Sequence, residues 1–143
     1  MINPSLNVDI KKEKSEEIEK RKTKLIERTD ALLSNIEFHV CNLIGIAFAY
    51  ADELETNKND KELIEQMGKM YREFKDNFQY NESKLPDKMV VLLKNIDATF
   101  IELLSNVETI VVNACNRLEK LKELLIKQLK ASRKKLHKGR SII

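Results

Sequence analysis

The stretch that decides the fold is PDKMVVLLKNIDATFIELLSNVETIVVNACNRLEKLKELLIKQLKASRKKL, residues 86–136. Apolar residues recur along it at alternating steps of three and four, which places them on one face of a helix. They are Leu93, Ile96, Phe100, Leu103, Val107, Ile110, Ala114, Leu118, Leu121 and Leu125. Such a stripe is typical of a helix in a coiled coil. Because Pro suits the first position of a helix, we expect one long helix from Pro86 to about Leu136.

The composition of the chain favours an all-helical fold. Its 143 residues include three Gly, two Pro and no Trp, so the usual signals for turns and strands are scarce. Hydrophobic residues make up 42% and charged residues 34%, which is too apolar and too periodic for a disordered chain. The sequence therefore predicts a single all-α unit.

Two further helices are expected upstream, at about 11–55 and 59–78. The first carries its own stripe of apolar residues: Ile18, Leu25, Leu32, Ile36, Leu43, Ile46 and Tyr50. Between the two helices, Asn57 or Asn59 could provide the cap of the second. Residues 1–10 and the basic residues 137–143 are expected to be flexible. The predicted fold is thus an elongated helical hairpin or coiled coil over 11–136, with two long helices and one shorter helix.

The unequal helix lengths suggest where partners bind. If the short helix folds back between the two long ones, each long helix projects past one end of the bundle. Apolar residues on the projecting parts would need helices of another protein. The predicted partner-binding stripe is Ile18, Leu25, Leu32, Ile110, Leu118, Leu121, Leu125 and Leu129. We expect the isolated chain to self-associate, and an open rod formed only inside a complex is an alternative.

One segment, residues 38–51, carries no charge for fourteen residues. A membrane span needs roughly twenty apolar residues, so this segment is expected to be a helix at the centre of the core. Gly45 and the alanines at 47, 49 and 51 are small enough to let a neighbouring helix approach.

Charge is distributed unevenly along the chain. Residues 1–30 hold eight Lys or Arg against seven Asp or Glu, residues 31–115 hold eight against fourteen, and residues 116–143 hold ten against two. The basic end could complement the dipole of its own helix or contact an anionic surface. The residues predicted for such a contact are Lys130, Arg133, Lys134, Lys135, Lys138 and Arg140. An anionic membrane fits better than nucleic acid, because no aromatic residue for base stacking follows Phe100.

No residue pattern points to catalysis, a cofactor or a metal. Glycine-rich phosphate loops, nucleophile elbows and HExxH or CxxC motifs do not occur. Cys41 and Cys115 are expected to be buried reduced thiols, and His39 a partly buried core residue. Because no catalytic pattern occurs, we expect a non-enzymatic protein. The beginning of the sequence has no signal-peptide pattern, so we expect it to reside in the cytoplasm or nucleus.

Two sequence blocks resemble a known family. The first, residues 52–70, resembles a block of subunit two of biogenesis of lysosome-related organelles complex 1. The matching residues are Glu53, Leu54, Asp60, Leu63, Glu65, Met67 and Lys69, with Ile64 and Met70 as conservative replacements. A second block resembles the closing heptads of that family at Val111, Ala114, Cys115, Leu118, Glu119, Leu121 and Leu125.

This resemblance implies a non-catalytic subunit of an elongated hetero-oligomer of small coiled-coil proteins. Such an assembly associates peripherally with the membranes of endosomes and lysosomes. There it helps to form carriers and to position organelles. Two other hypotheses follow from the residues alone. The chain could bind an anionic membrane or nucleic acid through its basic end, or it could be a coiled-coil subunit of a cytoskeletal or kinetochore assembly.

Overall fold

The computed structural model describes residues 4–58 and 60–141, and the side chains of residues 13–58 and 60–138. Within these ranges every regular element is a helix, so the predicted all-α fold is confirmed. Residues 1–3 and 142–143, which belong to the segments expected to be flexible, lie outside the described residues. The remainder of those two segments is helical, because the first helix begins at Pro4 and the last ends at Ser141.

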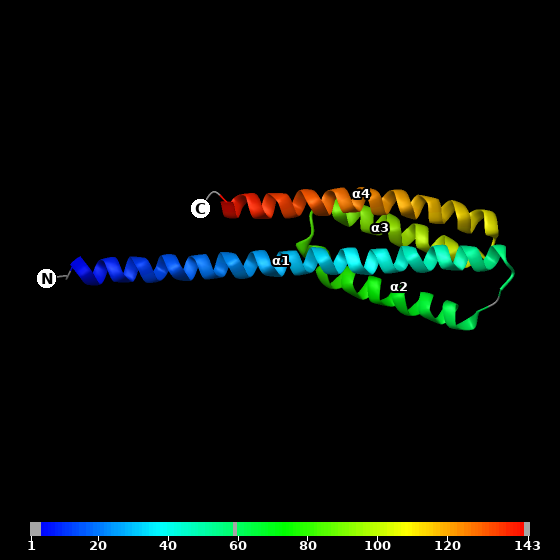
Figure 1. The fold of residues 1–143 in the computed structure, drawn as a ribbon, viewed down its shortest axis with the longest axis horizontal. Coiled ribbons are helices and arrows are strands. Elements are labelled where there is room, and N and C mark those ends of the chain that lie inside the picture. Colours follow the sequence, from blue (N-terminus) through cyan, green and yellow to red (C-terminus); the bar gives the residue numbers. More distant parts are fainter. Residues whose placement is uncertain (1–3, 59, 142–143) are drawn as a thin grey trace.

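The described residues form four α-helices, which run up and down along one long axis (Figure 1). They are α1 (Pro4–Glu55), α2 (Lys61–Asn81), α3 (Asp87–Ile101) and α4 (Glu108–Ser141), with short 3₁₀ segments η1 (Glu82–Lys84) and η2 (Glu102–Ser105) after α2 and α3. Helices α1 and α3 run one way, and α2 and α4 run the other. Helix α1 packs against α2 and α4, and α3 packs against α4.

The end of α1 is formed by Asn57, whose φ of 55° lies in the left-handed region. The amide of Lys58 donates to the carbonyl of Glu53 at 3.1 Å, as in a Schellman motif. Helix α2 is capped instead by Asp60, whose side chain accepts a 2.9 Å hydrogen bond from the Glu62 amide. The prediction that Asn57 caps the second helix is therefore wrong, and Asn59 lies outside the described residues.

The long helix predicted from 86 to 136 does not exist as one element. It is broken at Asn106, which has a φ of 57° and donates its amide to the carbonyl of Leu103. A left-handed residue ends a helix because it turns the chain away from the helix axis, and Asn tolerates this conformation better than most residues. After Asn106 the chain reverses, and α4 returns along α3 and α1. The predicted arrangement of three helices is thus wrong, because the described part of the chain forms four α-helices.

A continuous apolar core runs between the helices. Its largest fully buried side chains are Ile36, Val40, Leu43, Ile44, Phe74, Met89, Leu93, Ile96, Leu103, Leu118, Leu125 and Leu129. Polar contacts join helices around this core. The Tyr71 hydroxyl of α2 donates to Asp97 of α3, and burial with this bond raises the pKa of Tyr71 to about 12. The Tyr50 hydroxyl of α1 donates to Asn106 and so attaches the α3–α4 turn to α1.

The uncharged segment 38–51 lies in α1, and it has one buried side and one exposed side. Leu43, Ile44 and Ala47 are fully buried, as expected for the centre of the core, but Phe38 is largely exposed. Gly45 is exposed too, and a Cβ added there would meet no atom within 4 Å. The expectation that Gly45 allows a close helix approach is therefore wrong. By length and composition alone α1 could cross a membrane, a test that core helices of soluble proteins also pass.

Candidate functional site

The first part of α1 extends beyond the other three helices (Figure 1). We call residues 13–31 the projecting segment; its last residues lie beside the end of α4, where Asp30 is 3.1 Å from His137. No side chain in this segment is buried, and Leu33 is the first buried residue among the side chains of α1 that the structure describes, which begin at residue 13. Two of the predicted partner-binding residues lie here, and both are well exposed: Ile18 at 52% and Leu25 at 63%. The third, Leu32, is partly buried and packs against the core.

A hollow of about 760 Å³ lies at the base of the projecting segment, where α2 ends beside α1. Leu25, Thr29 and Leu32 line it from α1, and Asn77 and Tyr80 line it from α2. Tyr80 is exposed, and the Nζ of Lys84 lies 5.0 Å from the centre of its ring. An apolar strip and a hollow therefore adjoin at the position where α2 stops covering α1.

The remaining residues of the predicted stripe, except Ile110, lie inside this chain's own bundle. Leu118, Leu125 and Leu129 are fully buried, and Leu121 is partly buried against the core. The interpretation that these leucines project and lack a partner is wrong, because the turn at Asn106 folds α4 back onto α1 and α3. Ile110 is 41% exposed, near the start of α4.

The basic end of α4 is partly engaged by α1. Arg133 donates to Ser34 at 3.2 Å and to Glu37 at 3.1 Å, and His137 lies 3.1 Å from Asp30. Residues 137–143 are predicted to be flexible, yet His137 contacts Asp30, and Arg133 just before this tail contacts Ser34 and Glu37 of α1. The sequence contained the relevant signal, which is the contrast between an acidic middle and a basic end.

Other basic residues of this end remain on the surface. Lys130, Lys134 and Lys135 are exposed, and Lys138 is exposed but makes an interaction of its own. The side chain of Arg140 lies outside the described residues. Contact of this end with an anionic surface therefore stays a prediction that rests on three lysines.

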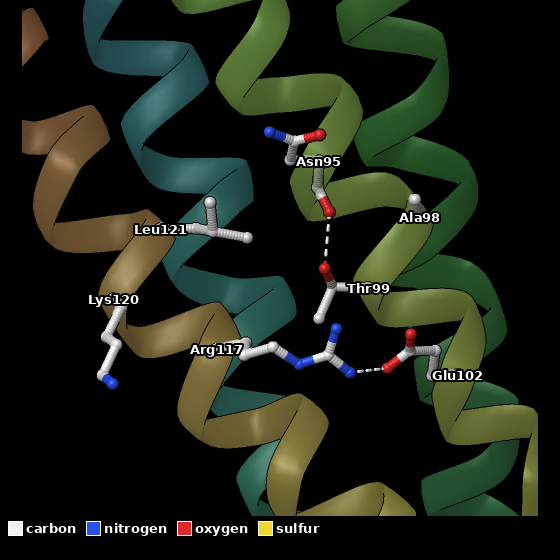
Figure 2. Close-up of a pocket in the computed structure, with 7 residues that line it drawn as sticks. All are labelled: Asn95, Ala98, Thr99, Glu102, Arg117, Lys120 and Leu121. Atoms are coloured by element: carbon white, nitrogen blue, oxygen red, sulfur yellow. Dashed lines mark hydrogen bonds and ion pairs between the residues drawn. The ribbon is translucent and has the colours of Figure 1, made fainter.

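A groove follows the outer face of the α3–α4 pair and consists of two adjoining hollows. The hollow of about 440 Å³ nearer the Asn106 turn is shown in Figure 2, with α3 on one side and α4 on the other. Arg117 reaches across it to form an ion pair with Glu102, while Leu121 points between the helices. The second hollow, of about 430 Å³, is lined by Val91 and Leu92 of α3 and by Leu124 of α4, among others. Sequence reasoning missed this groove, because it exists only when α4 folds back on α3.

The two cysteines are free thiols in different surroundings. Cys115 is buried, as expected, and donates to the carbonyl of Ala47 at 3.4 Å. Burial, with a smaller contribution from the charge of Asp52, raises its pKa to about 11. Cys41 is exposed, so the expectation that it is buried is wrong, although partial desolvation still raises its pKa.

This difference predicts selective labelling. At pH 8 the folded protein should react with iodoacetamide at Cys41 and not at Cys115, because a thiol with a pKa of about 11 is only about one part in a thousand thiolate at that pH. Raising the pH increases the thiolate fraction of Cys115, but burial still shields its sulfur. Mass spectrometry of digested protein measures both sites, and labelling in urea is the control in which both react. Equal rates at the two cysteines in folded protein would contradict the burial of Cys115.

Comparison with protein-family models, with curated proteins and with solved structures finds no match to this chain. The class of the molecule is therefore defined by its own geometry: an all-helical bundle with one projecting helix and a groove between its last two helices.

Proposed function

We propose that this chain is a non-catalytic subunit of a larger helical assembly, and that the projecting segment of α1 joins it to its partners. The observation that carries the proposal is a continuous helix that buries no side chain over residues 13–31. Isolated helices are marginal in water, and most helices in proteins depend on packing of an apolar face. A partner helix would supply that packing.

The spacing on the projecting segment favours a coiled-coil partner. Ile18, Leu25 and Leu32 are seven residues apart, so they lie on one stripe of the helix. Two ion pairs, Arg21 with Glu17 and Lys22 with Glu19, lie within this part of α1. Ile18 and Leu25 of the apolar stripe are exposed, whereas Leu32 packs against the core. The hollow beside Tyr80 would receive the end of the partner helix, in line with α2.

The cellular setting of the assembly is proposed from the family resemblance alone. In that setting the partners are small coiled-coil subunits that act on endosomes and lysosomes from the cytoplasm. A cytoskeletal or kinetochore assembly would use the same surface, so only the identity of the partners separates the two.

The proposal predicts the result of a double substitution. Ile18→Asp with Leu25→Asp should abolish capture of partner subunits, because two carboxylates would be placed in an apolar interface. Thermal unfolding of the isolated chain should change little, since both side chains are exposed in it. Affinity purification of the tagged chain with mass spectrometry measures capture, and circular dichroism measures stability.

The matched control is Lys20→Ala with Glu27→Ala. Each of these residues follows one of the two apolar residues by two positions, which places it on the opposite side of the helix. This variant should capture the same partners as the unmodified chain. Undiminished capture by the double-Asp variant would refute the proposed function, and recovery of ribosomes, chromatin or kinetochore proteins would refute the endosomal setting.

A further inference from the structure

The groove between α3 and α4 consists of two hollows that follow one another along the helix pair, and apolar residues line its floor. The Arg117–Glu102 ion pair crosses it near one end. Residues that line its two hollows follow helical spacing on both sides, at 88, 91, 95 and 98 in α3 and 102 at the start of η2, and at 117, 120, 124 and 127 in α4. Val91 is 56% exposed and Leu124 is 49% exposed, and Leu92 and Leu121 are partly buried beside them. Helix α3 has 15 residues, so the groove is about 22 Å long. That length accommodates about four turns of a helix.

The rim of the groove is basic. Lys88, Lys120 and Lys127 are exposed there, and none of the three forms an ion pair within the described part of the chain. The acidic residues of the rim are Asp87 and Glu102, and Glu102 is already paired with Arg117 (Figure 2). Three lysines thus border an apolar floor without a counter-charge of their own.

We propose that this groove binds an acidic amphipathic helix of a partner protein. Apolar side chains of that helix would lie on Val91, Leu92, Leu121 and Leu124, as in other complexes where a helix enters a groove. Carboxylates on its flanks would pair with Lys88, Lys120 and Lys127, which accounts for both the apolar floor and the basic rim. This surface is separate from the projecting segment, and the proposal does not depend on the function assigned to that segment.

Two other occupants fit the groove less well. The projecting segment of a second copy lacks the acidic excess, because residues 1–30 hold eight basic and seven acidic residues. A bilayer is flat, whereas the apolar floor lies in a concave strip between two helices. Charge and shape together therefore favour an acidic helix.

The test uses the full chain and a panel of synthetic helical peptides. Each peptide has about eighteen residues, with Leu at the heptad core positions in one of several registers and Glu at the flanking positions. Its twin has Lys in place of every Glu. Fluorescence anisotropy should show that at least one Glu peptide binds about tenfold or more tightly than its Lys twin, and that salt weakens this binding.

Variants of the chain locate the site. Lys120→Glu with Lys127→Glu should reverse the preference, so that the Lys peptide binds more tightly, while Val91→Gln with Leu124→Gln should weaken binding by about tenfold. All four substituted side chains are exposed, so these variants are expected to fold, and circular dichroism checks that they do. The Ile18→Asp, Leu25→Asp variant should bind the Glu peptide normally, which separates this proposal from the proposed function.

Four results would overturn the inference. They are failure of every Glu peptide to bind, equal affinity for the two members of each pair, binding that the lysine reversal leaves unchanged, and loss of peptide binding in the projecting-segment variant. Binding of the chain to phosphatidylserine vesicles that Lys120→Glu with Lys127→Glu abolishes, without any peptide binding, would assign the groove to a membrane surface instead.

Discussion

The substitution Leu118→Asp should unfold the protein. Leu118 has no exposed surface, and it lies on α4 where that helix packs against α1 and α3. An aspartate there would leave a charge without a partner in the core and remove the contacts of the leucine, an effect of about 4 kcal/mol or more. Urea denaturation followed by circular dichroism measures the change in the free energy of unfolding.

The matched control for this substitution is Leu124→Asp. Leu124 lies on the same helix and receives the same substitution, but about half of its surface is exposed. Its effect should stay within about 1 kcal/mol. A folded Leu118→Asp protein that had only lost its partners would contradict the structure, because it would place Leu118 on a free surface.

The second large effect is expected from removing residues 124–143. This deletion takes away Leu125 and Leu129, which are fully buried, and exposes Leu33 and Ile36 on both sides of Ser34. Each buried leucine contributes about 1.5–3 kcal/mol, so with the newly exposed side chains we expect a loss of about 5 kcal/mol or more. The midpoint of urea unfolding should therefore fall sharply, or the truncated protein should not fold.

Deletion of residues 1–20 is the companion experiment at the other end of the molecule. The described side chains of this region are all exposed, so the free energy of unfolding should change by less than about 1 kcal/mol. If the C-terminal deletion were the harmless one and the N-terminal deletion the destabilising one, α4 would not cover α1 as described.

Composition and periodicity were sufficient to predict part of this fold. The scarcity of Gly and Pro predicted helices, the polar residues between Glu55 and Lys61 predicted the first turn, and Pro86 predicted the start of α3. The comparison of helix lengths also predicted that α1 extends beyond a shorter helix packed beside it. These features depend on local chemistry, which a sequence displays directly.

The turn at Asn106 could not be predicted from periodicity, because apolar residues continue across it without a gap. In the sequence, Val107 and Ile110 continue the apolar spacing of α3, yet both side chains are substantially exposed. The buried face of α4 begins at Val111. The available signal was Ser105–Asn106, since Asn is common at the left-handed position that ends a helix. Tyr50 contributes from α1, far away in the sequence, because its hydroxyl donates a hydrogen bond to the side-chain oxygen of Asn106.

Of the two candidate surfaces, one could be predicted from the sequence and the other could not. Ile18 and Leu25 could be found from spacing alone, because an interval of seven residues places them on one stripe of a single helix. The α3–α4 groove could not, because Val91 and Leu124 become neighbours only after the chain has turned at Asn106. A surface that two helices form together can be predicted only when the topology is known, and here the topology depends on the turn at Asn106.

The pairing of α1 with α4 also sets the order in which the chain can complete its core during synthesis. Glu37 and Arg133 touch but are 96 residues apart, an interval that a ribosome needs about 5–20 s to translate. Throughout that interval Leu33 and Ile36 belong to a nascent helix whose final cover has not yet been made. The native bundle can therefore be completed only after the end of α4 has been synthesised, however early α1 forms.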